Sequence, residues 1–532
     1  MREASPESLS GRLYDVAIIG GGINGASAAQ HLAAAGYDVL LVEKGDFGSG
    51  STSRSSRLLH CGLRYLAPGR SIFDFVLHPT RLATAVRMAK QGMEARSEFV
   101  RTAPERTRAM RFCFPIFKGG PYRGWQVDLA FRILGAIGPG DVPLDYQRLP
   151  AAAARTMPLL KWLRDPDDLQ SVATFREYQF DWPERACVDA IPDAERLGAT
   201  VRNHMVGRIV RRESDHWVLA VGQAGQPNGE TDVRARAVLL MAGIWIDDIA
   251  KSVRPQARRR ILGTKGAHIL VKLAPECADF GIATLNSKQE PFYCIPWRGY
   301  HYFGPTETIY DGDKDDIRVT PKERDWLVKE ANNLLPGLRL SADDVLMDWA
   351  GVRPLTYDEA LPAGNRLRAV HDLAGDGMPD VFAMSAGPVM THRSAGRELV
   401  AHVSRRFAPS RSVAAPDYLP AKFPACTNSP ALVAGNASVK LSDLRHAVTA
   451  ERARTLSDVL LRRVGMGWDC KFSNDELARA ADVVGSELGW DDTRKANEIA
   501  SFQAEVGHLF RPHETLRPQA GGSFQSTAIT QQ

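Results

Sequence analysis

The sequence lacks any run of about 18 consecutive apolar residues, which is the length that a membrane-spanning helix requires. Its first residues, MREASPESLSGR, also lack the apolar segment of a secretory signal, so we expect a cytoplasmic protein. Cysteine is scarce: seven cysteines are scattered among 532 residues and are never spaced as CxxC. Neither a disulfide framework nor a zinc site is therefore expected, and no other metal site is predicted.

A strong charge imbalance is also missing. The chain has 67 basic and 62 acidic residues, which gives a formal net charge of +5 at pH 7. This excess is too small for the length of the chain to predict nucleic-acid binding, although it would suit an anionic substrate or an anionic membrane surface. The length itself predicts roughly three to four domains, which is enough protein to bury a large cofactor.

A strand, a glycine turn and a helix follow one another near the N-terminus. Residues 14–19 (YDVAII) form an apolar, β-rich run that stops at the turn GGGING, and an alanine-rich helix is predicted over residues 26–35. Residues 38–42 (DVLLV) predict a second buried strand, which ends at Glu43. This order is typical of a βαβ unit that binds the ADP part of a dinucleotide.

Each position of this unit has a physical role. Gly20 makes the tight turn, Gly22 lets the backbone approach a pyrophosphate, and Gly25 lets the helix pack closely on the strand. The N-terminus of the helix then faces the phosphate charge. Glu43 can accept hydrogen bonds from the ribose hydroxyls and would repel a 2′-phosphate, so NADP is disfavoured. The turn alone does not distinguish FAD from NAD.

Further motifs favour FAD. A loop rich in small and hydroxyl residues, GSGSTSRSSRLLHCGLRYL, follows at residues 48–66 and can lie along a cofactor. With this loop, the sequence resembles the FAD-dependent glycerol-3-phosphate dehydrogenases, within the D-amino-acid-oxidase-like flavoproteins. The segment SSRLLHCGLRYL is similar to the family's serine loop with HGGLRYL, and KGAH is similar to its KGSH. Later in the chain, IPW and GPTE resemble the family's IPW and GTTD, and GVRPL matches without change. The resemblance extends from about residue 14 to about residue 397.

This resemblance implies an α/β fold with three parts. A Rossmann-like FAD-binding domain would be assembled from residues 14–105, 185–260 and 350–405, and an antiparallel-sheet substrate domain, or cap, from residues 106–184 and 261–349. A linker (408–440) and a C-terminal helical domain (441–515) would follow. The residues expected to bind FAD are Gly20, Gly22, Gly25, Glu43, Ser51, Thr52, Ser55, Ser56, Val206, Ala242, Gly243, Gly387, Pro388 and Val389.

Oxidation of an alcohol by a flavin requires removal of the hydroxyl proton and transfer of a hydride to the flavin. Arg353, in GVRPL, is the first choice of substrate anchor, because a guanidinium group can bind a phosphate through two hydrogen bonds. Arg64 is the second, and Tyr65 would add a hydroxyl contact. His268, in KGAH, is predicted to be the base or a hydrogen-bond partner of the substrate. The rivals of His268 are His60 and His301.

The sequence departs from the family pattern at three places. Pro388 replaces the lysine of the family's GGKLTTYR, although the backbone of residues 387–389 is expected to contact the flavin regardless of side chain. A further family arginine, some 15 residues beyond GVRPL, is expected to fall at or near His371. Losing two cations should weaken the binding of an anion. HGG has become HCG, and His60 and Cys61 leave open a covalent link to FAD.

The leading hypothesis is a dehydrogenase that oxidises glycerol 3-phosphate and passes electrons to quinone, as the resemblance implies. One alternative is another polyol phosphate, such as erythritol 4-phosphate, or a hydroxy acid. Another is a flavin-binding protein without turnover. A quinone acceptor would require peripheral contact with the inner face of the membrane, for which residues 125–138 (WQVDLAFRILGAIG) are a candidate, although a helix packed in the cap would have the same pattern. A homodimer is also left open.

Overall fold

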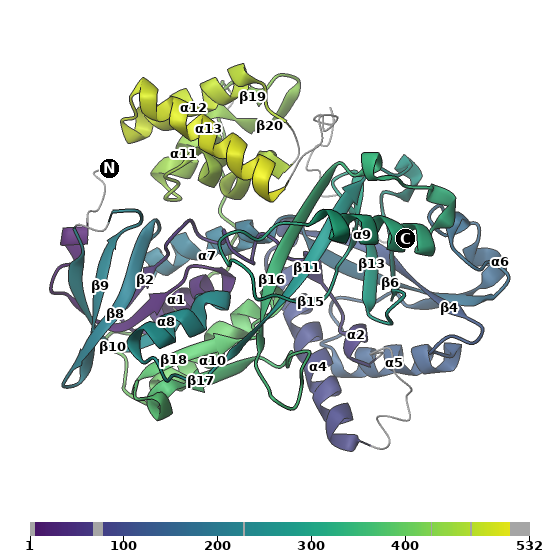
Figure 1. The fold of residues 1–532 in the computed structure, drawn as a ribbon, viewed down its shortest axis with the longest axis horizontal. Coiled ribbons are helices and arrows are strands. Elements are labelled where there is room, and N and C mark those ends of the chain that lie inside the picture. The colour runs from purple at the N-terminus through teal and green to yellow at the C-terminus, as the bar shows by residue number, and fades with distance from the viewer. Residues whose placement is uncertain (1–5, 67–77, 227–228, 427, 469–470, 511–532) are drawn as a thin grey trace.

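The computed structural model describes residues 6–66, 78–226, 229–426, 428–468 and 471–510. Two large β-sheets lie next to each other, and a C-terminal group of helices lies above them (Figure 1). The first sheet is on the left of that view and the second on the right. The cavity described below lies where the two meet.

The first sheet has the layout of a dinucleotide-binding unit. Its main path comprises β17 (Ala369–Asp372), β18 (Val381–Ser385), β10 (Thr231–Leu240), β1 (Leu13–Ile19), β2 (Val39–Val42) and β7 (Thr200–Arg202). β1 pairs in parallel with both β10 and β2. Because successive side chains of a strand point to opposite faces, Val16 and Ile18 enter one core and Ala17 and Ile19 another. The continuous apolar run therefore reflects a strand that is buried on both faces.

Helices and a hairpin build these two cores. α1 (Ile23–Ala34) packs against α7 (Pro183–Arg196) and α10 (His392–Ser404) on one face of the sheet. The alanines of α1 are buried, which lets these helices approach closely. On the other face lie the hairpin β8 (Met205–Glu213) and β9 (His216–Gln223) and the short helix α8 (Ile246–Val253).

The second sheet is largely antiparallel, as predicted. Its main path comprises β15 (Thr308–Ile309), β11 (Ile261–Val271), β14 (Tyr300–Gly304), β13 (Pro291–Trp297), β12 (Phe280–Leu285), β4 (Thr107–Phe117), β6 (Leu169–Phe180) and β3 (Leu58–Leu59). β5 (Gln147–Pro150) adds to β6, and β4 and β12 run parallel. Its flanking helices are α4 (Pro79–Thr102), α5 (Gly124–Ile137) and α9 (Pro321–Leu334).

A long strand, β16 (Met347–Thr356), brings two motifs together. It pairs with β11 in antiparallel register, so that Gly266 lies opposite Gly351 and His268 lies opposite Trp349. KGAH and GVRPL, far apart in sequence, are thus neighbours in the second sheet. Residues 350–356, which we expected in the first domain, belong to this strand, which pairs with β11 along its whole length.

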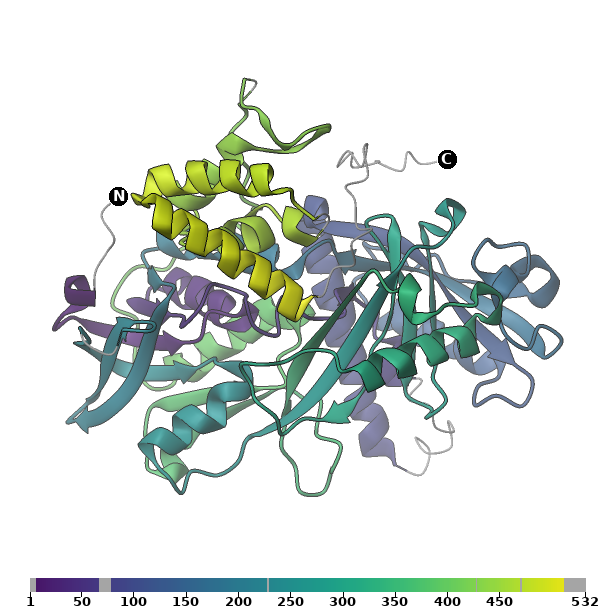
Figure 2. The same ribbon diagram turned by 45° about the horizontal axis from the view of Figure 1, so that its top comes forward.

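The C-terminal part begins after an irregular, mostly exposed segment over residues 408–426. It contains the hairpin β19 (Ala431–Val433) and β20 (Asn436–Lys440), the helix α11 (Leu441–Thr449), a π-helical segment η10 (Asp458–Arg463), α12 (Asn474–Leu488) and α13 (Asp492–Leu509). The Ser473 hydroxyl caps α12, and Gly489 ends it with a φ of 72°. In Figure 2, α12 and α13, in yellow, lie side by side at the upper left, and α13 contacts β16.

Among the described residues, no helix combines the length and the apolar character needed to span a membrane. The observed elements confirm the predicted fold class: a Rossmann-like α/β sheet, a largely antiparallel second sheet and a C-terminal helical region. Residues 511–515, the end of the predicted helical domain, lie outside the described residues.

Candidate active site

A cavity of about 640 Å³ opens between the glycine turn of the first sheet and the paired strands β11 and β16. Its volume falls within the range of about 300–1,000 Å³ that is common for ligand pockets. Predicted cofactor residues from six separate parts of the chain line it. They are Gly20, Gly22, Glu43, Ser51, Thr52, Ser55, Ser56, Val206, Ala242, Gly243, Gly387, Pro388 and Val389.

The glycine turn is shaped by close backbone contacts. Gly20 has a φ of 111°, and a Cβ there would lie 2.7 Å from the backbone of Met241. A Cβ on Gly25 would lie only 1.9 Å from the carbonyl oxygen of Gly20. Gly25 does not itself line the cavity, and its position matches the packing role predicted for it.

Glu43 lies at the end of β2, on the wall of the cavity. Its carboxylate accepts hydrogen bonds from the backbone N–H groups of Gly21, at 2.6 Å, and Gly45, at 2.8 Å. Burial nevertheless raises the pKa of Glu43, because these two hydrogen bonds only partly offset the cost of removing the charge from water. The carboxylate is thus fixed in place at the position predicted for a ribose acceptor.

The serine loop and the closing turn are tied to their neighbours. The Ser51 hydroxyl donates to the carbonyl oxygen of Val352 at 2.7 Å, and the Thr52 hydroxyl accepts from the Ile23 N–H at 3.1 Å. Asn24, inside the glycine turn, donates from its side chain to the carbonyl oxygen of Gly387 at 2.8 Å. This last bond joins two segments that are 363 residues apart and both line the cavity, and Asn24 is not among the predicted cofactor residues.

Cationic side chains gather at the other end of the cavity. Arg64, Arg353 and Arg366 line it together with Glu307 and are close enough to influence one another electrostatically. Burial lowers the pKa of Arg353 to about 10, so its guanidinium is still charged at neutral pH. Within the described part of the chain, Arg353 Nη1 is buried and has no hydrogen-bond partner. Such a donor is suited to an anionic group of a ligand.

Gly266, the glycine of KGAH, makes room for this arginine. A Cβ at position 266 would lie 2.5 Å from Nη2 of Arg353 and 2.9 Å from its Cζ. The register of β11 and β16 therefore explains why a glycine stands beside the arginine of GVRPL. Tyr65 also lines the cavity, with the Arg64 guanidinium 5.9 Å from its ring.

The assignment of the second family arginine to His371 is wrong. His371 lies on β17, where its Nε2 is 2.7 Å from the Ser385 hydroxyl, and it does not line the cavity. Arg366, five residues earlier, lines the cavity and forms an ion pair with Glu307. Motif spacing misplaced the arginine because the length of the loop between β16 and β17 cannot be read from one sequence. Only the cation replaced by Pro388 is missing from the expected set.

His268 stands beside these arginines on β11. Its ring stacks on Trp349, with ring centroids 5.1 Å apart, and its Nε2 lies 3.1 Å from the Ser56 hydroxyl. Burial, reinforced by the charges of Arg353 and Arg57, holds the pKa of His268 well below its usual value. The imidazole is therefore neutral at physiological pH.

The rival histidines differ in position. His301 is buried away from the cavity, with Nε2 3.1 Å from the carbonyl oxygen of Cys277. His60 lines the cavity, and burial together with the charge of Arg64 lowers its pKa to about 3. Cys61 is buried outside the cavity, where its N–H donates to Glu177 at 2.9 Å. Of the two residues considered for a covalent link, only His60 faces the cavity.

These residues fit an FAD molecule. The turn that accommodates a pyrophosphate, the fixed carboxylate for a ribose, the backbone at residues 387–389 and the buried guanidinium of Arg353 all line one cavity. A dinucleotide-binding sheet joined in this way to a second sheet defines a flavin-dependent oxidoreductase.

Comparison with known proteins gives the family. A family model described as "FAD dependent oxidoreductase" matches residues 15–401, and one described as "C-terminal domain of alpha-glycerophosphate oxidase" matches residues 426–495. The chain belongs to the FAD dependent oxidoreductase family, and FAD is its cofactor.

Named relatives agree with the resemblance seen in the motifs. The chain is 30% identical over 414 residues to the glycerol-3-phosphate dehydrogenase of Synechocystis sp.. The matched region covers 74% of this chain and 71% of the relative. It is 27% identical over 407 residues to the aerobic glycerol-3-phosphate dehydrogenase of Staphylococcus haemolyticus, and this match covers 76% of this chain and 69% of the relative. The predicted family resemblance is confirmed.

Solved structures show the same fold. The glycerol-3-phosphate dehydrogenase from Bacillus halodurans, complexed with FAD, has a TM-score of 0.68 at 19% identity and covers 94% of this chain and 96% of its own. The L-alpha-glycerophosphate oxidase from Mycoplasma pneumoniae, with FAD bound, has a TM-score of 0.56 at 18% identity. Its match covers 76% of this chain and 98% of the oxidase chain.

Proposed function

We propose that this protein oxidises glycerol 3-phosphate to dihydroxyacetone phosphate and passes the electrons to quinone. The observation that carries the proposal is the cluster of Arg64, Arg353 and Arg366 beside His268, at the end of a cavity lined by the glycine turn. The names of the relatives, glycerol-3-phosphate dehydrogenases, point to the same substrate.

The residues divide the work as follows. The arginines bind the phosphate group and fix the orientation of the substrate, since a phosphate dianion requires more than one cation in a partly buried site. Neutral His268 accepts the hydroxyl proton, and the Ser56 hydroxyl near Nε2 orients the ring. FAD supplies the hydride acceptor. The substrate thus loses one proton and one hydride.

Pro388 keeps a second substrate class under consideration. Without the family's lysine, the cavity has one cation fewer than expected, so an anion should bind less strongly than in the family pattern. Another polyol phosphate, such as erythritol 4-phosphate, or a hydroxy acid would still use Arg353.

The test is anaerobic bleaching of the purified flavoprotein by a panel of polyol phosphates, polyols and hydroxy acids. Rapid loss of the visible absorbance of oxidised flavin with glycerol 3-phosphate is the expected result. In His268→Gln the bleaching rate should fall by about 10²–10⁴-fold while FAD stays bound. His301→Gln, outside the cavity, is the control and should bleach at the wild-type rate. Bleaching only by another compound would replace the substrate, and none at all would favour a non-catalytic flavoprotein.

We further propose that the protein works in the cytoplasm and reaches quinone at the inner face of the membrane through α5. Trp125 and Leu129 are 58% and 41% exposed, and Arg132 lies on the same exposed face. Phe131 is unsuitable as a probe of this face, because it is buried and stacks on Tyr146 with ring centroids 4.1 Å apart.

Liposome flotation tests this face of α5. Vesicles that contain anionic lipid should carry the wild-type protein upward, and replacing both Trp125 and Leu129 by serine should reduce that fraction. Ile309→Ser, at an exposed position on β15, is the control for general loss of apolar surface. Equal flotation of all three proteins would remove α5 from consideration.

A further inference from the structure

A buried group of charged side chains joins the C-terminal helices to the loop that carries Glu43. Asp46 lies in this loop, three residues after Glu43, and is 2% exposed. Arg462 Nε lies 2.6 Å from Asp46 Oδ2, and Arg463 reaches both carboxylate oxygens, at 2.6 and 2.8 Å. Both arginines come from the π-helical segment η10. The loop and the C-terminal region therefore share one ion-pair network.

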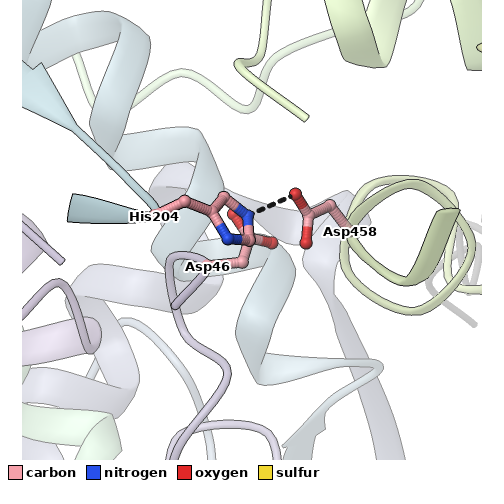
Figure 3. Close-up of side chains that lie close together, drawn as sticks. All are labelled: Asp46, His204 and Asp458. Atoms are coloured by element: carbon pink, nitrogen blue, oxygen red, sulfur yellow. Dashed lines mark hydrogen bonds and ion pairs between the residues drawn. The ribbon is translucent and has the colours of Figure 1, made fainter. Parts of the chain in front are cut away.

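His204 and Asp458 extend this network. Figure 3 shows the Asp458 carboxylate facing the His204 imidazole, with Asp46 beside the ring, and His204 Nε2 lies 2.9 Å from Asp458 Oδ2. Side-chain ligand atoms of these three residues lie within 4.8 Å of one another, which is close enough for a metal site. Arg462 and Arg463 already compensate the two carboxylates, so the group is an ion-pair network.

The network is connected to the ribose acceptor through short backbone links. The Gly45 N–H donates to Glu43, and the Gly45 carbonyl oxygen accepts from the His204 N–H at 2.8 Å. The Asn203 side chain donates to Asp46 at 3.0 Å and to the carbonyl oxygen of Arg452, in the C-terminal region, at 2.9 Å. Moving Asp46 would therefore disturb the segment that fixes the Glu43 carboxylate.

Burial makes the coupling strong. Asp46 and Asp458 have side chains with essentially no exposure, and Arg463 is equally buried. If the C-terminal region undocks, these charges lose their partners in a low-dielectric environment, where an unpaired charge is strongly destabilising. The loop must then either expose Asp46 to water or keep it unpaired, and both outcomes change its conformation.

We propose that Arg462 and Arg463 are positioning residues for the cofactor: they hold the Glu43–Asp46 loop in its FAD-binding conformation. FAD binding and docking of the C-terminal helices are consequently linked, so each stabilises the other. Each arginine acts through Asp46. The inference depends on FAD as the cofactor and is independent of the substrate.

The experiment uses the full chain and two readouts that do not depend on turnover. In Arg463→Met, the dissociation constant of FAD, measured by quenching of flavin fluorescence, should rise by at least about tenfold, within the usual range of coupling between two sites. Arg445→Met is the matched control, because Arg445 pairs with Glu487 on the surface of the C-terminal region and should leave the FAD affinity unchanged.

Limited proteolysis is the second readout, and its first comparison uses only the wild-type protein. Saturating FAD should slow cleavage of the wild-type apoprotein within residues 408–426 by about tenfold, by the same linkage. In Arg463→Met this protection should shrink. An FAD affinity of Arg463→Met within about twofold of wild type would overturn the proposal. If that variant does not fold, equal cleavage of the wild-type protein with and without FAD would overturn it instead.

Discussion

Arg366 provides a direct test of the substrate end of the cavity. Arg366→Gln removes one cation from the cavity wall and preserves most of the side-chain length. A charge-assisted hydrogen bond contributes about 1.5–3 kcal/mol, which corresponds to roughly 10- to 150-fold in affinity. The concentration of glycerol 3-phosphate that gives half the maximal rate of anaerobic flavin bleaching should rise by that factor. The maximal rate should change less, because the arginine contacts the phosphate and the reacting carbon is elsewhere.

The ion pair with Glu307 complicates this measurement. Once Arg366 is gone, the Glu307 carboxylate has lost its partner and repels the phosphate, which would exaggerate the effect. The double variant Glu307→Gln/Arg366→Gln removes both charges. Its half-saturating concentration should lie between those of the wild type and Arg366→Gln.

His371 is the matched control, because motif spacing assigned the family's arginine to this position. Its side chain bonds to Ser385 away from the cavity, so His371→Gln should change the half-saturating concentration by less than about twofold. Weaker binding in His371→Gln, together with normal binding in Arg366→Gln, would refute the placement of the phosphate.

Two further predictions concern stability. Gly25→Ala would place a Cβ 1.9 Å from the Gly20 carbonyl oxygen and should cost about 1–3 kcal/mol, seen as a lower Tm in thermal denaturation. Gly135→Ala, with open space around its Cβ, is the control, and equal Tm values for the two variants would contradict the steric argument. Burial alone would lower the pKa of His204, but the nearby Asp458 carboxylate outweighs it and raises the pKa above 6.5. A histidine whose pKa is higher in the folded state than in the unfolded state stabilises the fold. Its full contribution is present below the pKa of the unfolded state and is lost as the pH rises through the pKa of the folded state. The difference in unfolding free energy between wild type and His204→Gln, measured by urea denaturation, should therefore be larger at about pH 6 than at about pH 9. A difference that grows with pH would show that the pair of His204 and Asp458 does not stabilise the fold in this way.

The cofactor end of the cavity was predictable because its signals are local. Gly20, Gly22 and Gly25 stand within one turn, and the two strands that flank the helix are short apolar runs. The contact between Gly25 and Gly20 lies within the turn itself, whereas Met241 and Gly387 contact the turn from distant parts of the chain. A motif of this kind can be read without knowing how the rest of the chain folds.

The substrate end depends on contacts between distant segments. Arg64, Arg353 and Arg366 come from separate segments, which only the folded chain brings to one cavity. The low pKa of His268 likewise results from burial, to which Arg353 and Arg57 add. Arg57 is 211 residues earlier in the printed sequence and is buried between Trp297 and Trp468. Neither the count of residues nor the periodicity contains that information.

The position of Pro388 limits what the backbone can supply to the flavin. We expected the backbone of residues 387–389 to serve regardless of side chain, but proline has no N–H, so Gly387 and Val389 are the amide donors left in this turn. The Gly387 carbonyl oxygen is held by Asn24, which fixes the turn against the glycine motif. The substitution therefore removes a cation and one amide donor together while the turn keeps its place. In the proposed function, binding of the phosphate group therefore depends on the three arginines, which are still present.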